Sequence, residues 1–301
     1  MPMSRSGILL IDKPEGPSSA QIVHRVKNIL AAKKVGHLGT LDPFASGLLL
    51  IGVNEGTKIA EIFLSGTKRY HGIMVLGVET DTQDGTGKVL QEFPVPTIME
   101  KDLRVIEKDF TGSLQQVPPM FSALKRDGVR LYRLARQGKE VPRDPRPIRI
   151  DTLRIDKISE RELEFAVTCS RGTYVRTLAA DMGRRLGCGA YLKTLRRVGC
   201  DHLDIAQAIR FEDLVSVASS AEIPLVSLET ALNQLRAVIW QSRLVSRLRL
   251  GQQQVLEQIG SRQACEEFVA ILEPRGELAA LARWVDDIRG GCWRLFRVFR
   301  C

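Results

Sequence analysis

The sequence has no long run of apolar residues. Its apolar stretches are short, such as Gly47 to Val53, whereas a helix that crosses a membrane needs about 20 consecutive apolar residues. The amino-terminal residues lead into a single short apolar segment, which is too brief for a secretory signal peptide. We therefore expect a cytosolic protein that has no membrane partner.

Motifs for cofactors are also missing. The sequence contains no dinucleotide fingerprint, no nucleophile elbow and no H-E-x-x-H helix. Gly85 to Lys88 resembles the end of a phosphate-binding loop, but the upstream glycine is absent and Val89 replaces Ser or Thr. Asp81 and Asp84 lack the spacing of a calcium loop. These absences favour, for an enzyme, chemistry by side chains alone, with no small-molecule cofactor and no metal.

Cysteine and histidine are few. The 6 cysteines form no C-x-x-C pair, and the 4 histidines do not lie at zinc-binding spacing from them. In a cytosolic protein of this size we expect the cysteines to be reduced and mostly buried thiols.

Positive charge, by contrast, is plentiful and unevenly distributed. The 301 residues carry 44 Lys and Arg against 35 Asp and Glu, a net charge of +9. Residues 124–149 hold nine basic and three acidic side chains, whereas residues 210–301 have a net charge of +1. Pro142, Pro145 and Pro147 exclude a long regular helix from this basic segment. The pattern favours binding of a polyphosphate over a merely solvated basic surface.

The amino-terminal pattern predicts a strand followed by a helix. Residues 7–11 are a short apolar run typical of a buried strand, and residues 12–17 form a turn that two prolines and a glycine enforce. Ser18 and Gln21 have the spacing of a capping box, so a helix should begin there. We expect this helix to end at Gly36.

The middle of the chain contains both a strand-like and a helix-like pattern. Residues 163–169 alternate apolar and polar side chains, as in a half-buried strand. Thr173 is the expected cap of a helix that follows. Since regular βαβ units are missing, we expect an α+β fold with a mixed sheet and not a doubly wound one.

The carboxy-terminal stretch has a different character. The chain length fits one large domain plus a smaller one, and beyond about residue 235 the basic charge comes only from Arg. Residues 268–272, 278–285 and 293–299 predict short strands. A small β-rich module is therefore expected at this end.

Asp42 is the first candidate for chemistry. It precedes Pro43 in a loop that Gly36, Gly39 and Gly47 punctuate, and such a loop can present one carboxylate on a rigid frame. The local sequence alone favours the simpler interpretation, an Asp-Pro turn, because such turns are common.

Arg176 and Tyr70 are the other two candidates. Arg176 falls in the first turn of a helix, where the helix dipole disfavours a cation by about 0.3–1 kcal/mol. It therefore either holds an anion or lies along the surface with its head in water. Tyr70 follows Lys68 and Arg69, which suits stacking on an RNA base beside phosphates. The commoner fate of a strand aromatic is packing in the core.

Several segments of the chain form a recognisable series across about residues 7–213. They are Asp12–Ser19, Gly36–Pro43, Ala45–Leu49, Lys68–Tyr70, Gly77–Asp84, Pro118–Lys125, Tyr132, Ala135–Arg136, Cys169–Thr177 and Leu195–Arg197. In these segments and in their order, the sequence resembles the TruB-type family of bacterial tRNA pseudouridine-55 synthases.

The resemblance implies a fold and an activity. The fold would be a catalytic domain over residues 1–240, with a mixed, largely antiparallel sheet and an RNA-gripping insertion at about residues 120–150. A PUA-like RNA-binding domain would follow at residues 245–301. The activity would be isomerisation of one uridine in the T-stem-loop of tRNA, position 55, with the base flipped out of the RNA. No cofactor would be needed, and the protein would be a monomer.

The resemblance also implies roles for individual residues. Asp42 would be the catalytic carboxylate, either attacking C1′ or taking the 2′ proton, with Arg176 as its partner. Tyr70 would stack on uracil and assist proton transfer at C5. Lys13 would support the Asp42 loop, and Leu195 would pack beneath the base. The residues implied in substrate binding are Lys13, His37, Lys68, Arg69, Arg136, Tyr174 and Leu195.

Two other interpretations remain open at this point. One is a tRNA-binding protein or folding chaperone without chemistry. The other is a glycosidase-like hydrolase, although most such enzymes use two carboxylates and only Asp42 stands out.

Overall fold

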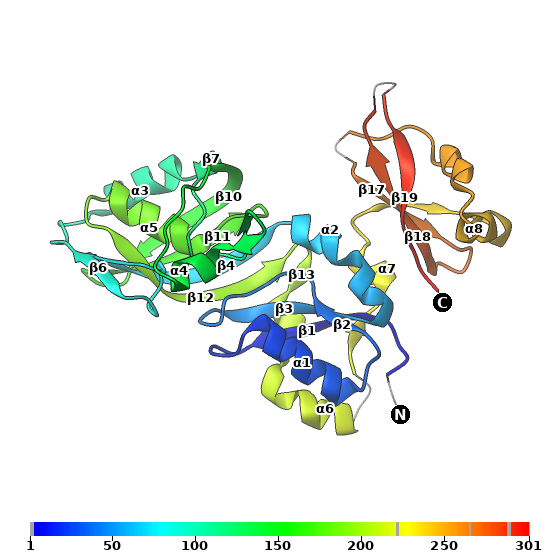
Figure 1. Cartoon of the computed structure of the whole chain (residues 1–301), viewed down its shortest axis with the longest axis horizontal. Coiled ribbons are helices and arrows are strands. Elements are labelled where there is room, and N and C mark those ends of the chain that lie inside the picture. Colours follow the sequence, from blue (N-terminus) through cyan, green and yellow to red (C-terminus); the bar gives the residue numbers. More distant parts are fainter. Residues whose placement is uncertain (1–2, 221–222, 265, 288–289, 301) are drawn as a thin grey trace.

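A large mixed sheet forms the centre of the molecule (Figure 1). The computed structural model describes residues 3–220, 223–264, 266–287 and 290–300. The principal strands lie in the order β14-β1-β3-β12-β4-β11-β10-β7, with β2, β13 and β15 paired at the side. The sheet contains both parallel and antiparallel pairs, which confirms the expected α+β class with a mixed sheet.

The strands of this sheet have the following bounds: β1 Gly7–Lys13, β2 Val35–His37, β3 Ser46–Val53, β4 Lys68–Leu76, β7 Gly112–Gln116, β10 Arg146–Lys157, β11 Glu162–Cys169, β12 Ala190–Cys200, β13 Leu203–Asp204, β14 Ile209–Arg210 and β15 Leu225–Val226. Two small hairpins, β5–β6 and β8–β9, comprise β5 Val78–Thr80, β6 Val89–Glu92, β8 Lys125–Arg126 and β9 Val129–Arg130. The α-helices are α1 Ser19–Leu30, α2 Ala60–Ser65, α3 Glu100–Asp109, α4 Leu131–Arg136, α5 Val175–Arg185, α6 Leu214–Ser220, α7 Leu228–Ala231 and α8 Ser242–Arg249.

Helix α1 begins as its sequence predicts and ends earlier. The Ser18 hydroxyl accepts a hydrogen bond from the Gln21 amide, and the Gln21 side chain accepts one from the Ser18 amide, so the capping box is confirmed. The expected end at Gly36 is wrong. The chain leaves the helix after Leu30 because Ala31 takes a left-handed conformation, and Gly36 lies within β2.

Helix α5 packs against β12. Its apolar residues Val175, Leu178, Ala179 and Met182 are buried. The expectation that Thr173 caps the helix is wrong, because the Thr173 hydroxyl donates to the carbonyl of Ser170. The residue before the helix is Tyr174, and the Gln116 side chain bonds both of its backbone groups.

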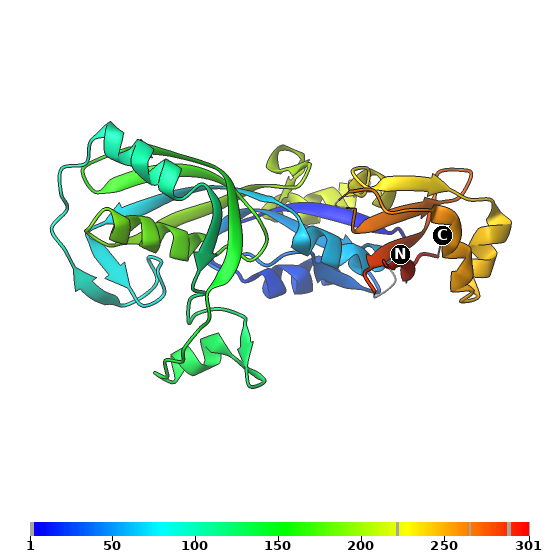
Figure 2. The same ribbon diagram turned by 90° about the horizontal axis from the view of Figure 1, so that it is seen from above.

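Residues 117–145, which hold most of the basic segment, project from the sheet as an arm between β7 and β10 (Figure 2). It contains the β8–β9 hairpin and the six-residue helix α4. The structure describes all of residues 124–149, and it confirms that this proline-rich segment forms no long helix.

The carboxy-terminal strands form a second sheet, β16-β17-β18-β19. Its members are β16 Arg236–Ile239, β17 Phe268–Leu272, β18 Leu278–Val285 and β19 Cys292–Val298, so the three predicted strands are present. Strand β16 precedes the boundary expected at residues 240–245. Phe268 and Phe299 share one hydrophobic cluster with Phe63 of α2, so this sheet packs directly on the larger domain.

Two further expectations concern the whole chain. Cys169, Cys188 and Cys200 are buried free thiols and Cys292 is partly buried, while Cys265 and Cys301 lie outside the described residues. Of the helices in the described ranges, none combines the length and apolar character that a membrane span requires.

Candidate active site

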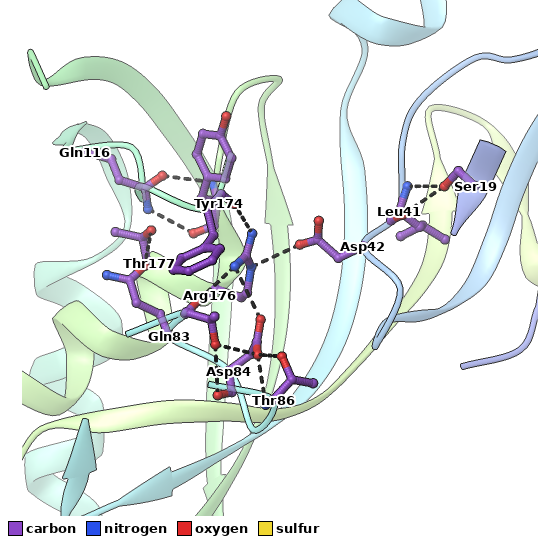
Figure 3. Close-up of polar contacts among 12 residues, drawn as sticks. Ser19, Leu41, Asp42, Gln83, Asp84, Thr86, Gln116, Tyr174, Arg176 and Thr177 are labelled. Carbon is purple, nitrogen blue, oxygen red and sulfur yellow. Dashed lines mark hydrogen bonds and ion pairs between the residues drawn. The ribbon is translucent and has the colours of Figure 1, made fainter. Parts of the chain in front are cut away.

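The loop that carries Asp42 is fixed by buried side chains on one side (Figure 3). Ser19, the first residue of α1, donates from its hydroxyl to the carbonyl of Leu41 and accepts from the Leu41 amide, both at 2.8 Å. Asp42 itself keeps 42% of its side-chain surface exposed. The Asp42 carboxylate is thus accessible to solvent, while the backbone beside it is held in place by Ser19.

Lys13 supports the same loop from below. Its side chain is fully buried, and Nζ donates to the carbonyls of Pro14, Pro17 and Pro43 at 2.8, 2.9 and 3.2 Å. Burial lowers the pKa of Lys13 to about 8, partly offset by the negative charges of Glu15 and Asp42. Lys13 therefore lies in the loop-supporting position that we expected of it.

Arg176 bridges the carboxylate loop to the rest of the site. Its Nε lies 3.0 Å from Oδ2 of Asp42, which is the pairing that we expected. Nη1 donates to the carbonyl of Thr82 at 2.8 Å and Nη2 to that of Phe121 at 2.9 Å. Since the Arg176 side chain is 5% exposed, the alternative in which its head lies in water is wrong.

Asp84 is a second carboxylate on Arg176, and the sequence pattern did not identify it. Its Oδ2 lies 3.3 Å from Nη1 of Arg176. Its Oδ1 accepts from the Thr82 hydroxyl and from both the amide and the hydroxyl of Thr86. The alternation of Thr and Asp in the β5–β6 turn was a possible signal, because such residues often bond to nearby backbone in turns. Asp84 is buried with both oxygens engaged, so it orients Arg176 and neutralises part of its charge.

Tyr70 and Leu195 lie on adjacent strands near the Asp42 loop. Tyr70 pairs with Arg197 across β4 and β12, and Leu195 pairs with Gly72. Tyr70 is half-buried against the core, so it packs there while part of it stays accessible. Burial raises the pKa of Tyr70 to about 12 against the opposing charge of Arg197, so the phenol is neutral at pH 7.

His37 and Tyr174 border this region from different elements. His37 ends β2, and its Nδ1 is buried without a hydrogen-bond partner among the residues that the structure describes. Burial, together with the nearby charge of Arg197, lowers the pKa of His37, so the ring is neutral at pH 7. Tyr174 is half-buried just before α5, and burial raises its pKa.

The remaining expected RNA contacts have three different environments. Lys68 is buried, and its ammonium donates to the carbonyls of residues 63, 64 and 66 at the end of α2. The expectation that Lys68 binds substrate is therefore corrected: the ammonium satisfies helix-terminal carbonyls. Arg69 forms an ion pair with Asp204 at 2.9 Å. Arg136 is exposed on α4, 5.6 Å from the ring centroid of Tyr132.

A groove of about 810 Å³ runs between the base of the arm and the start of α5. Arg146, Arg149, Arg171, Ser170 and Tyr174 are among the residues that line it. Three guanidinium groups beside an aromatic ring suit a phosphate backbone with unpaired bases. Within the described ranges, no three His, Cys, Asp or Glu side chains converge as a metal site would require.

Comparisons with known proteins show what this chain is similar to. Two family descriptions match the chain: "TruB family pseudouridylate synthase (N terminal domain)" over residues 27–175 and "tRNA pseudouridylate synthase B C-terminal domain" over residues 176–240. A relative from Geobacter sulfurreducens, named tRNA pseudouridine synthase B, is 45% identical over 97% of this chain and 99% of its own. The protein of that name from Syntrophotalea carbinolica is 37% identical over 98% of both chains.

A solved structure gives an independent view of the fold. A chain in the crystal structure of a Cbf5-Nop10-Gar1 complex superposes with a TM-score of 0.71. The match covers 97% of this chain and 85% of that one at 24% identity. At this level of identity the likeness speaks for the shared fold alone.

Proposed function

The chain belongs to the TruB family of tRNA pseudouridine synthases, and we propose that it isomerises uridine 55 in the T-loop of tRNA to pseudouridine. The N1–C1′ bond of the nucleoside breaks, uracil rotates, and C5 bonds to C1′. The observation that carries the proposal is the accessible carboxylate of Asp42, ion-paired to Arg176 on a fixed loop.

Asp42 is the group that initiates the reaction. It must be ionised to do so, and its Oδ2 lies 3.0 Å from Nε of Arg176. In one route an Asp42 oxygen attacks C1′, and uracil leaves with the bonding electrons on N1. After rotation, C5 attacks C1′ and the bond to Asp42 breaks.

A second route uses the same carboxylate as a base. Asp42 takes the proton from C2′ while the N1–C1′ bond breaks, which leaves a double bond between C1′ and C2′. C5 then bonds to C1′, and C2′ regains its proton. In either route C5 finally loses its own hydrogen and N1 gains one.

Tyr70 and Leu195 hold the base during rotation. Leu195 is apolar and nearly buried, and Tyr70 offers an aromatic face with a neutral hydroxyl. The hydroxyl assists proton transfer at C5 late in the reaction. Both side chains project from neighbouring strands that run past the Asp42 loop.

The arm and the groove at its base bind the T-stem-loop. Flipping a base costs a few kcal/mol, which stacking and phosphate contacts must offset. The exposed cations of the arm, Arg136 among them, and the groove arginines supply such contacts.

The test uses a T-stem-loop RNA that carries tritium at C5 of the target uridine. Formation of the C5–C1′ bond releases that tritium to water, and no release by the wild-type chain would exclude the proposal. Tight RNA binding without release would indicate a chaperone. Free uracil as the product would indicate a hydrolase, although the second carboxylate of the site, Asp84, has both oxygens engaged.

A further inference from the structure

Arg197 is a second buried arginine, and the proposed chemistry gives it no role. It lies on β12 with 2% of its surface exposed. Among the described residues, no carboxylate lies within ion-pair distance of its guanidinium. A cation buried in this way is costly unless hydrogen bonds satisfy it, so its partners indicate its purpose.

Those partners are backbone carbonyls on both sides of Asp42. Nη2 donates to the carbonyl of Gly39 at 3.2 Å and Nη1 to that of Thr40 at 3.4 Å. Nε donates to the carbonyl of Leu48 at 2.7 Å. A single guanidinium therefore ties the segment before Asp42 to the strand after it.

The backbone of Arg197 makes a second connection. It pairs in parallel with Gly47 of β3 and antiparallel with Tyr70 of β4. The approach to β3 is so close that a Cβ on Gly47 would lie 2.3 Å from the Arg197 carbonyl oxygen. Because directly paired residues of neighbouring strands project on the same face, the guanidinium lies beside the phenol of Tyr70.

Lys13 and Ser19 also hold the Asp42 loop, but from the end of β1 and the start of α1. Of these three anchors, Arg197 is the one whose own strand pairs with that of Tyr70. We propose that Arg197 is a positioning residue that sets the distance between the Asp42 carboxylate and the Tyr70 ring, so that both face the same base. This inference rests on the proposed function.

The first test compares two adjacent arginines. Arg197→Lys keeps the charge but replaces a three-nitrogen fork by one ammonium, which cannot span the three carbonyls. Arg196→Lys is the matched control, because Arg196 is 43% exposed and pairs with Asp12 at 2.6 and 3.0 Å. We expect Arg197→Lys to lower the single-turnover rate of tritium release by about 100-fold, the cost of a misplaced reacting group. RNA affinity should change less than about 3-fold, and Arg196→Lys should alter neither quantity by more than that.

The second test asks whether the missing group can be supplied. Arg197→Ala leaves space for a guanidinium ion, so added guanidinium, at concentrations that leave the protein folded, should restore part of the rate. Urea, its neutral analogue, should not. A merely structural role would produce no such rescue.

Several results would overturn the inference. Equal rates for the Arg197→Lys and Arg196→Lys variants would do so, as would parallel losses of rate and RNA affinity. An Arg197→Lys chain that does not fold at 15 °C would show that the residue serves global stability. A wild-type chain that releases no tritium would remove the proposed function itself, whereas release by wild type and by Arg197→Lys at equal rates would remove this inference alone.

Discussion

Arg176 meets Asp42 through Nε, while its two terminal nitrogens are held by Asp84 and two backbone carbonyls. The guanidinium therefore cannot rotate to follow the Asp42 carboxylate. Arg176 is thus held in place, while the Asp42 carboxylate stays accessible. A carboxylate that reacts with a substrate needs this combination of a fixed partner and an open approach.

Asp42→Asn should abolish turnover and leave RNA binding intact. The amide has neither the charge to attack C1′ nor the basicity to take the 2′ proton, so we expect a loss of about 10³-fold or more in the rate of tritium release. Filter binding of the T-stem-loop should give a Kd within a few-fold of wild type. A variant with a rate near that of wild type would show that Asp42 has a different role.

Asp84→Asn should slow catalysis through Arg176. The exchange leaves the buried guanidinium with one carboxylate fewer and places an amide against it, so we expect about 10- to 100-fold slower turnover and a loss of roughly 1–3 kcal/mol of stability. Asp81→Asn is the control, because Asp81 lies in the same turn and accepts only the Lys88 amide among the hydrogen bonds recorded for it. Similar rates for the two variants would contradict the role given to Asp84.

Lys13 should make stability depend on alkaline pH. Its folded-state pKa of about 8 lies below the ordinary value of 10.5, so between these values the unfolded chain binds more protons than the folded one. Stability relative to a Lys13→Met variant should thus rise as pH increases from 8 to 10.5, by at most about 1 kcal/mol per pH unit. Urea unfolding of both proteins at several pH values measures this difference. A difference that is constant with pH would mean that Lys13 is not desolvated.

The arm should contribute more to RNA affinity than the carboxy-terminal module does. Changing Arg130, Arg133, Arg136 and Arg146 to Gln removes exposed charge from the arm and its base. We expect binding to weaken about 10-fold or more and the salt dependence to become shallower.

The matched control removes four exposed arginines from the carboxy-terminal module, namely Arg243, Arg247, Arg275 and Arg294. We expect that variant to stay within about 3-fold of wild type. The comparison is made by titration at several salt concentrations. Equal losses in the two variants would contradict the proposed ordering.

The parts of the fold that the sequence predicted are those set by local chemistry. Ser18 and Gln21 cap α1 through bonds within four residues, and the alternation along β11 follows from burial of one face. The end of α1 was wrong because Ala31 adopts a left-handed conformation that a glycine usually marks.

The site was predictable only where a residue had an unusual local position. Arg176 stood out as a cation at a helix start, and its carboxylate partner followed from the family resemblance. Asp84 and Arg197 did not stand out, because their partners lie about 90 and 150 residues away in sequence and local patterns carry no signal for such contacts. Lys68 was misassigned for a different reason. Its proximity to Tyr70 in sequence suggested RNA, whereas its ammonium turns back to the carbonyls of residues 63, 64 and 66 at the end of α2.

The register between β3 and β12 has a mechanical consequence. The pairing recorded for the described residues joins these two strands at Ser46–Arg196 and Gly47–Arg197, whereas β12 and β4 are paired along most of their length. The large sheet therefore has two parts, which meet at a narrow junction between β3 and β12. Asp42 precedes β3 in one part, and Arg176 lies on α5, which packs against β12 in the other. Flexing about that junction would change the separation of these two groups, and the Arg176–Asp42 ion pair therefore joins the Arg197 hydrogen bonds in holding the two parts of the sheet at a fixed angle.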